Sequence, residues 1–156
     1  MRRRAVFLDR DGVIDEPAAP GEYIRNWSEF RLLPNVADWI RLFNALDLLV
    51  IVVTNQRGVA LGRMAAADVE DIHRRMREQL AALGARIDDV LWCPHQEGVC
   101  ECRKPRPGLA HQARDRWDID LAASLMIGDS DRDRELARVC GMRFVRAVGG
   151  RIAEVP

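Results

Sequence analysis

The chain has 156 residues, and its 24 Lys and Arg residues balance its 24 Asp and Glu residues, so the formal net charge is zero. Hydrophobic residues at 48% and charged residues at 31% are ordinary globular proportions, which exclude a disordered, collagen-like or coiled-coil chain. The neutral balance disfavours nucleic-acid binding, and the apolar runs are too short for a membrane span or a signal peptide. We therefore expect one cytoplasmic domain over residues 1–156 that works as a monomer.

Apolar runs alternate with amphipathic stretches along the chain. The apolar runs predict strands at 5–8, 48–53, 90–92, 125–127 and 144–145. The amphipathic stretches predict helices at 36–46, 65–83, 109–117 and 131–140. This alternation is typical of an α/β fold with a mostly parallel sheet between helices. The irregular stretch 16–33 is loop-sized, so we expect no large cap domain.

Three of the predicted strands are followed by small polar or acidic residues. Asp9 follows the first strand, Thr54 the second, and Gly128 and Asp129 the fourth. Each residue alone could be a helix cap. Together they indicate one pocket, because ligands of open parallel sheets bind beyond the carboxyl ends of the strands.

Asp9 and Asp11 place two carboxylates on a tight turn that Gly12 permits. Carboxylates this close repel one another unless a cation lies between them. Mg²⁺ suits such oxygen ligands, and Asp129 would add a further ligand from a neighbouring strand. A metal held by carboxylates is typical of phosphoryl transfer. Because a nucleophile must be ionised and a general acid protonated, we expect different environments to separate the pKa values of Asp9 and Asp11.

Lys104 is the only lysine among the 24 basic residues. It could be a chance survivor in an arginine-rich chain. A compact ammonium, however, can contact a carboxylate and a phosphate together where a planar guanidinium does not fit. We therefore predict a catalytic role for Lys104.

The segment 93–107 contains a second cluster of possible metal ligands. Cys93, His95, Cys100 and Cys102 would satisfy a tetrahedral Zn²⁺ fully, which indicates a structural site. A disulfide or unligated buried thiols are the alternatives. A zinc ion here would order a long loop that has no core of its own and would direct Arg103 and Lys104.

Four motifs of this sequence, in their order along the chain, resemble those of the haloacid dehalogenase-like (HAD) phosphatases. The motifs are Phe7-Leu-Asp9-Arg-Asp11-Gly-Val13, Val53-Thr54-Asn55-Gln56, Lys104-Pro105, and Gly128-Asp129 with Asp133. The resemblance spans about residues 5 to 146 and implies a HAD-like Rossmannoid three-layer sandwich.

The resemblance also implies a role for each matching residue. Asp9 would be the nucleophile that forms an aspartyl-phosphate. Asp11 would act as general acid and then as base, and its backbone carbonyl would bind Mg²⁺ together with Asp9 and Asp129. Thr54 and Lys104 would hold the phosphoryl oxygens, whereas Asp133 would orient this shell.

The zinc loop is similar to that of heptose-1,7-bisphosphate 7-phosphatases and histidinol-phosphate phosphatases. The stretch Thr54-Asn55-Gln56-Arg57-Gly58 resembles the heptose enzymes more closely, although Arg57 replaces their serine. We therefore expect a small phosphorylated sugar as substrate, contacted by Asn55, Gln56, Arg57, Arg103 and Lys104. The alternatives are histidinol phosphate, another sugar phosphate, or a zinc-ordered binding module without activity.

Three further residues receive no functional role from the sequence. His73 lies among arginines on the long predicted helix, so we expect it on a solvated face. His111 is expected at a polar surface position, and Cys140 as a small buried residue.

Overall fold

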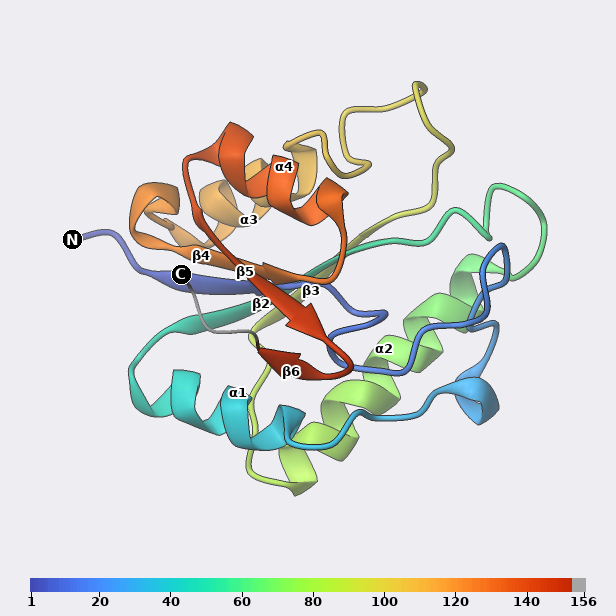
Figure 1. Ribbon diagram of the computed structural model, residues 1–156, viewed down its shortest axis with the longest axis horizontal. Coiled ribbons are helices and arrows are strands. Elements are labelled where there is room, and N and C mark those ends of the chain that lie inside the picture. The colour runs from blue at the N-terminus through green and yellow to red at the C-terminus, as the bar shows by residue number, and fades with distance from the viewer. Residues whose placement is uncertain (153–156) are drawn as a thin grey trace.

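A six-stranded sheet forms the centre of the computed structural model, which describes residues 1–152 (Figure 1). The strands occur in the order β3-β2-β1-β4-β5-β6, and all neighbours are parallel except β5 and β6. The strands are β1 (Ala5–Leu8), β2 (Leu49–Asn55), β3 (Asp89–Cys93), β4 (Leu125–Gly128), β5 (Arg143–Val148) and β6 (Arg151–Ile152).

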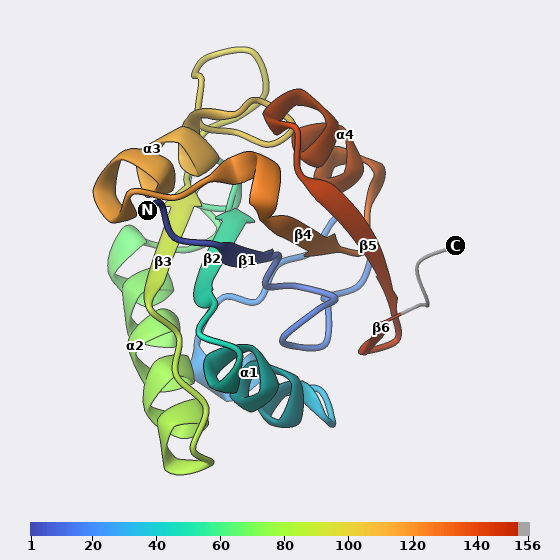
Figure 2. The same cartoon turned by 90° about the vertical axis from the view of Figure 1, so that its left-hand side faces the viewer.

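Helices cover both faces of this sheet, as Figure 2 shows from the side. The α-helices are α1 (Val36–Ala45), α2 (Ala66–Ala82), α3 (Gly108–Trp117) and α4 (Asp131–Cys140). Two short 3-10 helices, Trp27–Glu29 and Leu121–Ala123, lie in the connections. The predicted mostly parallel three-layer α/β fold is confirmed.

The alternation of side chains along β1 explains the two hydrophobic layers. Val6 and Leu8 pack with α1 and α2, whereas Phe7 packs with α3 and α4 on the opposite face. Because side chains alternate along a strand, a strand covered on both faces reads as a continuous apolar run. This explains why the sequence pattern located β1 and β2.

Four strands extend further than predicted, β4 by the single residue Gly128. β2 continues through Thr54 and Asn55, and β3 ends on Cys93. These three residues, which were predicted to belong to the site, therefore lie at the ends of strands rather than in loops. β5 begins and ends beyond the two residues predicted, and its antiparallel partner β6 was not predicted. A two-residue strand carries too little hydrophobic pattern to be recognised. The last four residues of the predicted domain lie outside the described range.

The carboxyl ends of β1, β2 and β4 lie side by side at one edge of the sheet. β1 lies between β2 and β4, so the chain crosses from one side of β1 to the other after β3. The described part of the chain carries no large cap over this edge; only loops surround it, including the yellow loop in Figure 1. Within residues 1–152, no helix has both the length and the apolar composition that crossing a bilayer requires.

Candidate active site

Lys104 links strand β2, the residue after strand β1 and helix α4 at the carboxyl edge of the sheet. Its ammonium donates hydrogen bonds to Asp9 Oδ1 at 2.9 Å, to Asp133 Oδ1 at 2.8 Å and to the Val53 carbonyl oxygen at 2.9 Å. These three acceptors use all three N–H donors of the ammonium. The Lys104 side chain is only 4% exposed. Its position is consistent with the prediction that this lysine belongs to the site.

Burial alone would lower the pKa of Lys104, but the carboxylates of Asp9 and Asp133 outweigh burial and raise this pKa. Lys104 is thus a permanent cation. Removing Asp9 or Asp133 would leave part of this buried charge uncompensated, which would destabilise the folded chain. The ammonium therefore both neutralises and positions the carboxylates around it.

Asp133 joins helix α4 to this cation. It is the third residue of α4, where its Oδ2 accepts hydrogen bonds from the backbone nitrogen (3.3 Å) and the hydroxyl (2.9 Å) of Ser130. This is a capping-box arrangement, which satisfies amide groups at the start of a helix. Its other oxygen binds Lys104, as we expected of a residue that orients the site. Gly128 makes room for it, because a Cβ at Gly128 would lie 2.2 Å from the Asp133 Cβ.

Carboxylates that follow the strands lie close together, as their positions in the sequence predicted. Asp9, Asp129 and Asp133 each place an oxygen within 4.8 Å of the others. Gly12 has a φ of +88°, and a Cβ there would lie 1.9 Å from Asp129 Oδ2, so glycine is required both by the turn and by this close approach. Hard carboxylate oxygens in this arrangement fit Mg²⁺, although Asp133 already serves Lys104 and Ser130.

Asp11 is held at both carboxylate oxygens. Oδ1 accepts from Arg10 Nε at 3.1 Å and Nη2 at 2.8 Å, and Oδ2 accepts from Gln56 Nε2 at 3.0 Å. Gln56 Nε2 also lies 3.0 Å from Thr54 Oγ1. The predicted general acid, Thr54 and Gln56 therefore form one hydrogen-bonded group.

The pKa values of the two catalytic carboxyls diverge, but in the sense opposite to their expected roles. Burial raises the pKa of Asp9, despite the opposing effect of Lys104. Burial also acts to raise the pKa of Asp11, yet Arg10 and hydrogen bonds outweigh it and lower that pKa. These directions come from the protein's own groups. A divalent cation beside Asp9 would favour its ionised form, and a phosphate dianion near Asp11 would favour its proton.

Asn55 and Gln56 occupy positions different from those expected of substrate-binding residues. The Asn55 side chain donates to the Lys104 carbonyl oxygen at 3.1 Å and accepts from the Lys104 amide at 2.9 Å. Gln56 is 2% exposed and bonds to Asp11 and Thr54. Both side chains are thus engaged in orienting catalytic residues, because strand β2 extends through Asn55 and holds them inside the site.

The Cys/His cluster lies beside this site at the end of β3. Cys93, His95, Cys100 and Cys102 offer ligand atoms within 4.8 Å of one another. The sulfur of Cys93 is 2.8 Å from that of Cys102 and 3.6 Å from that of Cys100. These separations exceed the roughly 2.05 Å of a disulfide, and the cysteines are free. Four such donors fit a tetrahedral metal site without an open position.

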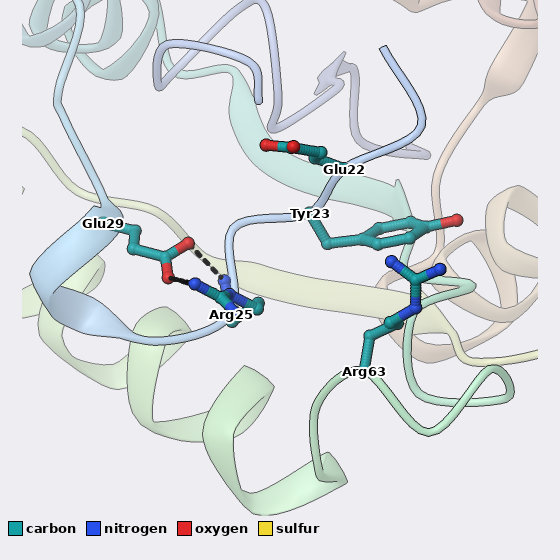
Figure 3. Close-up of a pocket in the computed structure, with 5 residues that line it drawn as sticks. All are labelled: Glu22, Tyr23, Arg25, Glu29 and Arg63. Atoms are coloured by element: carbon teal, nitrogen blue, oxygen red, sulfur yellow. Dashed lines mark hydrogen bonds and ion pairs between the residues drawn. The ribbon is translucent and has the colours of Figure 1, made fainter. Parts of the chain in front are cut away.

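The predicted substrate loops meet beside the site. Arg57 Nε donates to the Tyr23 hydroxyl at 3.1 Å, which connects the loop after β2 with the irregular segment 16–33. A cavity of about 210 Å³ lies at this junction. Figure 3 shows its lining side chains, with Arg63 below the Tyr23 ring and Arg25 paired with Glu29. None of the residues that line it belongs to the catalytic set, so it lies beside the chemistry rather than at it.

Arg103 was predicted as a phosphate contact and is 7% exposed. Its Nη1 atom has no hydrogen-bond partner within residues 1–152. Burial and the nearby guanidinium groups of Arg132 and Arg57 lower the pKa of Arg103. Such a convergence of cations around an unpartnered donor fits an anionic ligand group.

The sequence interpretation was wrong about His73 and gave no role to Arg10 and Asp15. His73 is buried on α2 rather than solvated, and its Nε2 lies 3.1 Å from Arg10 Nη1. Arg10 and Asp15 are both fully buried. An arginine between the two aspartates of the first motif was the available signal. Cys140 is partly buried rather than fully buried, and His111 is also of intermediate exposure.

Known proteins are similar in sequence to this chain over most of their length. Residues 101–151 match the HAD-hydrolase-like family model. A D-glycero-beta-D-manno-heptose-1,7-bisphosphate 7-phosphatase of Rhodopseudomonas palustris is 42% identical over 156 residues, covering 95% of this chain and 85% of the relative. The chain belongs to the HAD-like phosphatases. A Mycobacterium tuberculosis D-glycero-alpha-D-manno-heptose-1,7-bisphosphate 7-phosphatase is 46% identical over 134 residues, covering 85% and 70% of the two chains.

A solved structure extends this family relationship to the fold. The D,D-heptose 1,7-bisphosphate phosphatase of B. bronchiseptica, complexed with magnesium and phosphate, superposes on this HAD-like phosphatase with a TM-score of 0.84. It is 34% identical, and the match covers 90% of this chain and 78% of that structure. The resemblance read from the four motifs is therefore confirmed at the level of the family and of the fold.

Proposed function

We propose that this HAD-like phosphatase removes the C7 phosphate of a D-glycero-D-manno-heptose 1,7-bisphosphate. The observation that carries the proposal is the presence, at one sheet edge, of the Lys104–Asp9 hydrogen bond and of the group in which Gln56 bonds to Asp11 and Thr54, with Asp129 close to Asp9. The heptose bisphosphatases named above share the family and most of the chain length. A single domain supplies every residue of this assembly.

Asp9 would attack the phosphorus atom in line with the leaving oxygen and form an aspartyl-phosphate. Asp11 would protonate the leaving oxygen and then take a proton from the water that cleaves the aspartyl-phosphate. Lys104 and Thr54 would hold phosphoryl oxygens: the Lys104 ammonium, which lies beside Asp9, would exchange one of its three present acceptors for a phosphoryl oxygen, and the Thr54 hydroxyl, whose oxygen accepts from Gln56, would donate its hydrogen. Mg²⁺, held by Asp9, Asp129 and the Asp11 backbone carbonyl, would neutralise phosphate charge.

Arg103 and Arg57 are our candidates for the second phosphate, supported by the unpartnered Arg103 donor and by the guanidinium groups of Arg57 and Arg132 near Arg103. A cavity of about 310 Å³ opens beside Arg103 and Lys104, so an anion there would lie next to the reacting centre. Replacing Arg57 with Ser should raise KM for the bisphosphate about tenfold and leave that for a monophosphate nearly unchanged. An equal change for both substrates would contradict this assignment.

We further propose that the Cys/His cluster holds Zn²⁺ and that the protein is a cytoplasmic monomer. Four soft and imidazole donors without an open position favour a structural zinc. Free cysteines suit a reducing compartment. Metal analysis of the purified protein, together with its mass in solution, tests the metal and the oligomeric state.

The substrate proposal is tested by comparing kcat/KM for both anomers of the heptose bisphosphate, sugar monophosphates and histidinol phosphate, with and without Mg²⁺. We expect a heptose bisphosphate to be the preferred substrate in the presence of Mg²⁺. A hundredfold preference for histidinol phosphate, about 2.7 kcal/mol of transition-state stabilisation, would overturn the substrate assignment. Absence of turnover on every phosphomonoester would favour a binding module without activity.

A further inference from the structure

A buried arginine connects the catalytic edge to helix α2. Arg10 directs Nε and Nη2 to Asp11 Oδ1 at 3.1 and 2.8 Å, and its remaining nitrogen, Nη1, lies 3.1 Å from His73 Nε2. A guanidinium only donates hydrogen bonds, so His73 Nε2 must be the unprotonated, accepting nitrogen. The ring proton is therefore on Nδ1.

The surroundings of His73 keep it in this form. The imidazole is buried, and it meets the Trp92 ring edge to face, with centroids 6.4 Å apart and an interplanar angle of 72°. Burial, together with the charge of Arg10, lowers the pKa of His73 to about 3, against a smaller opposing effect of Asp11. His73 is thus a neutral acceptor, fixed by packing, with no direct contact to the reacting atoms.

The contacts at Asp11 divide its two oxygens into different roles. Oδ1 accepts two N–H groups from Arg10, which occupy its two lone pairs. Oδ2 accepts one N–H group, from Gln56, and so keeps one lone pair for a proton. Proton exchange therefore takes place at Oδ2 as long as both N–H groups of Arg10 remain bonded to Oδ1.

We propose that His73 is a positioning residue for proton transfer, acting through Arg10 on Asp11. The inference rests on the proposed function, in which Asp11 exchanges the proton. In the first step Asp9 forms a bond to phosphorus, the bond to the leaving oxygen breaks, and that oxygen receives the Oδ2 proton. In the second step a water oxygen attacks phosphorus, the Asp9–phosphorus bond breaks, and Oδ2 takes the water proton.

The absence of an acceptor at position 73 would leave Arg10 Nη1 buried without a partner. An unpaired buried donor is costly, so the guanidinium would turn toward another acceptor and release its two-point hold on Oδ1. The carboxyl of Asp11 would then sample orientations in which Oδ2 does not face the leaving oxygen. Proton transfer would slow, whereas substrate binding, which does not involve this carboxyl oxygen, would change little.

The test compares H73L, which removes the acceptor, with H73Q, whose side-chain oxygen can accept from Arg10. H111L on helix α3 is the matched control. For the heptose bisphosphate we expect H73L to lower kcat about tenfold with KM within about twofold, and H73Q to restore most of kcat. With p-nitrophenyl phosphate, the initial burst of p-nitrophenol reports the first step alone, and because this leaving group needs no proton, the loss of burst rate in H73L should be less than about threefold.

The outcomes separate this inference from the proposed function. Equal losses on both substrates, or H73L with wild-type kcat, would overturn the positioning role while leaving the phosphatase intact. Wild-type protein inactive on both substrates would overturn the proposed function and this inference with it. A measurement on the wild type avoids any folding defect of the variants: the imidazole ¹⁵N spectrum should show His73 protonated at Nδ1 alone, and an Nε2–H tautomer would overturn the inference.

Discussion

The carboxylate cluster and the Cys/His cluster are assembled over very different distances along the chain. Asp9 and Asp129 come from β1 and β4, which the sheet brings together through long connections. The Cys/His cluster comes from the single stretch 93–102. The first depends on the register of the sheet, whereas the second depends on ligand spacing within one loop.

The two clusters nevertheless meet at Lys104. This residue follows Cys102 by two positions, yet its ammonium bonds to Asp9 on β1 and Asp133 on α4. The local cluster therefore ends two residues from the ammonium that bonds to two carboxylates of the long-range cluster. This difference predicts that the carboxylate cluster controls turnover, whereas the Cys/His cluster acts through stability and through the placement of Lys104.

Replacing Asp9 with Asn should have the largest effect. The amide keeps the size of the side chain but is not a nucleophile, so we expect kcat to fall at least about a thousandfold. Circular dichroism and zinc content should match the wild type, because the Cys/His cluster does not include this strand. Substantial residual turnover would argue against a covalent intermediate.

Replacing Lys104 with Met tests the link between the clusters. The buried carboxylates of Asp9 and Asp133 would lose their shared partner, so unfolding should become easier by about 3–5 kcal/mol, and turnover should be lost. Urea denaturation measures the change. A surface arginine such as Arg74, whose ion pairs are exposed, provides the control, and its replacement should cost no more than about 1 kcal/mol. Equal effects at the two positions would contradict the proposed link.

The exchange of Cys100 for Ser tests the local cluster alone. Loss of one ligand should weaken metal binding and destabilise the loop by about 3 kcal/mol, which lowers Tm by roughly 10 °C in a chain of this size. Bound zinc should fall with it. Cys140, a half-buried cysteine outside the cluster, is the matched control, and its exchange for Ser should leave zinc content unchanged. Zinc retained in the Cys100 variant would exclude this ligand set.

The exchange of Asp15 for Asn should have an effect that depends on pH. Burial, with the nearby charge of Asp11, raises the pKa of Asp15 from 3.8 to about 9, so the folded chain keeps a proton that the unfolded chain releases. Stability is therefore fully present below about pH 4 and declines as pH rises toward 9. The Asn variant cannot titrate and should lose this slope, by up to about 1.4 kcal/mol per pH unit.

Denaturation of both proteins at pH 5, 6, 7 and 8 measures this difference. The Asn variant should become progressively more stable than the wild type as pH rises. Parallel stability curves would show that Asp15 titrates normally in the folded chain.

The α/β fold, the four motifs and the candidate metal ligands of both clusters could be predicted from the sequence. Continuous apolar runs such as Val50–Val53 mark strands covered on both faces, and residues at their ends mark the shared edge. The Cys/His cluster was readable because its four donors are close in the chain.

The contacts of residues within and between the motifs could be seen only in the folded chain. His73 was predicted to be exposed because arginines surround it in the sequence. This prediction was wrong, since His73 lies on the buried side of α2 and contacts Arg10. Asn55 was read as a substrate contact because it follows Thr54, yet it bonds to the backbone of Lys104, 49 residues away. Spacing along a chain specifies which residues can share a face, but contacts between remote segments follow from strand register and packing, which local patterns do not encode.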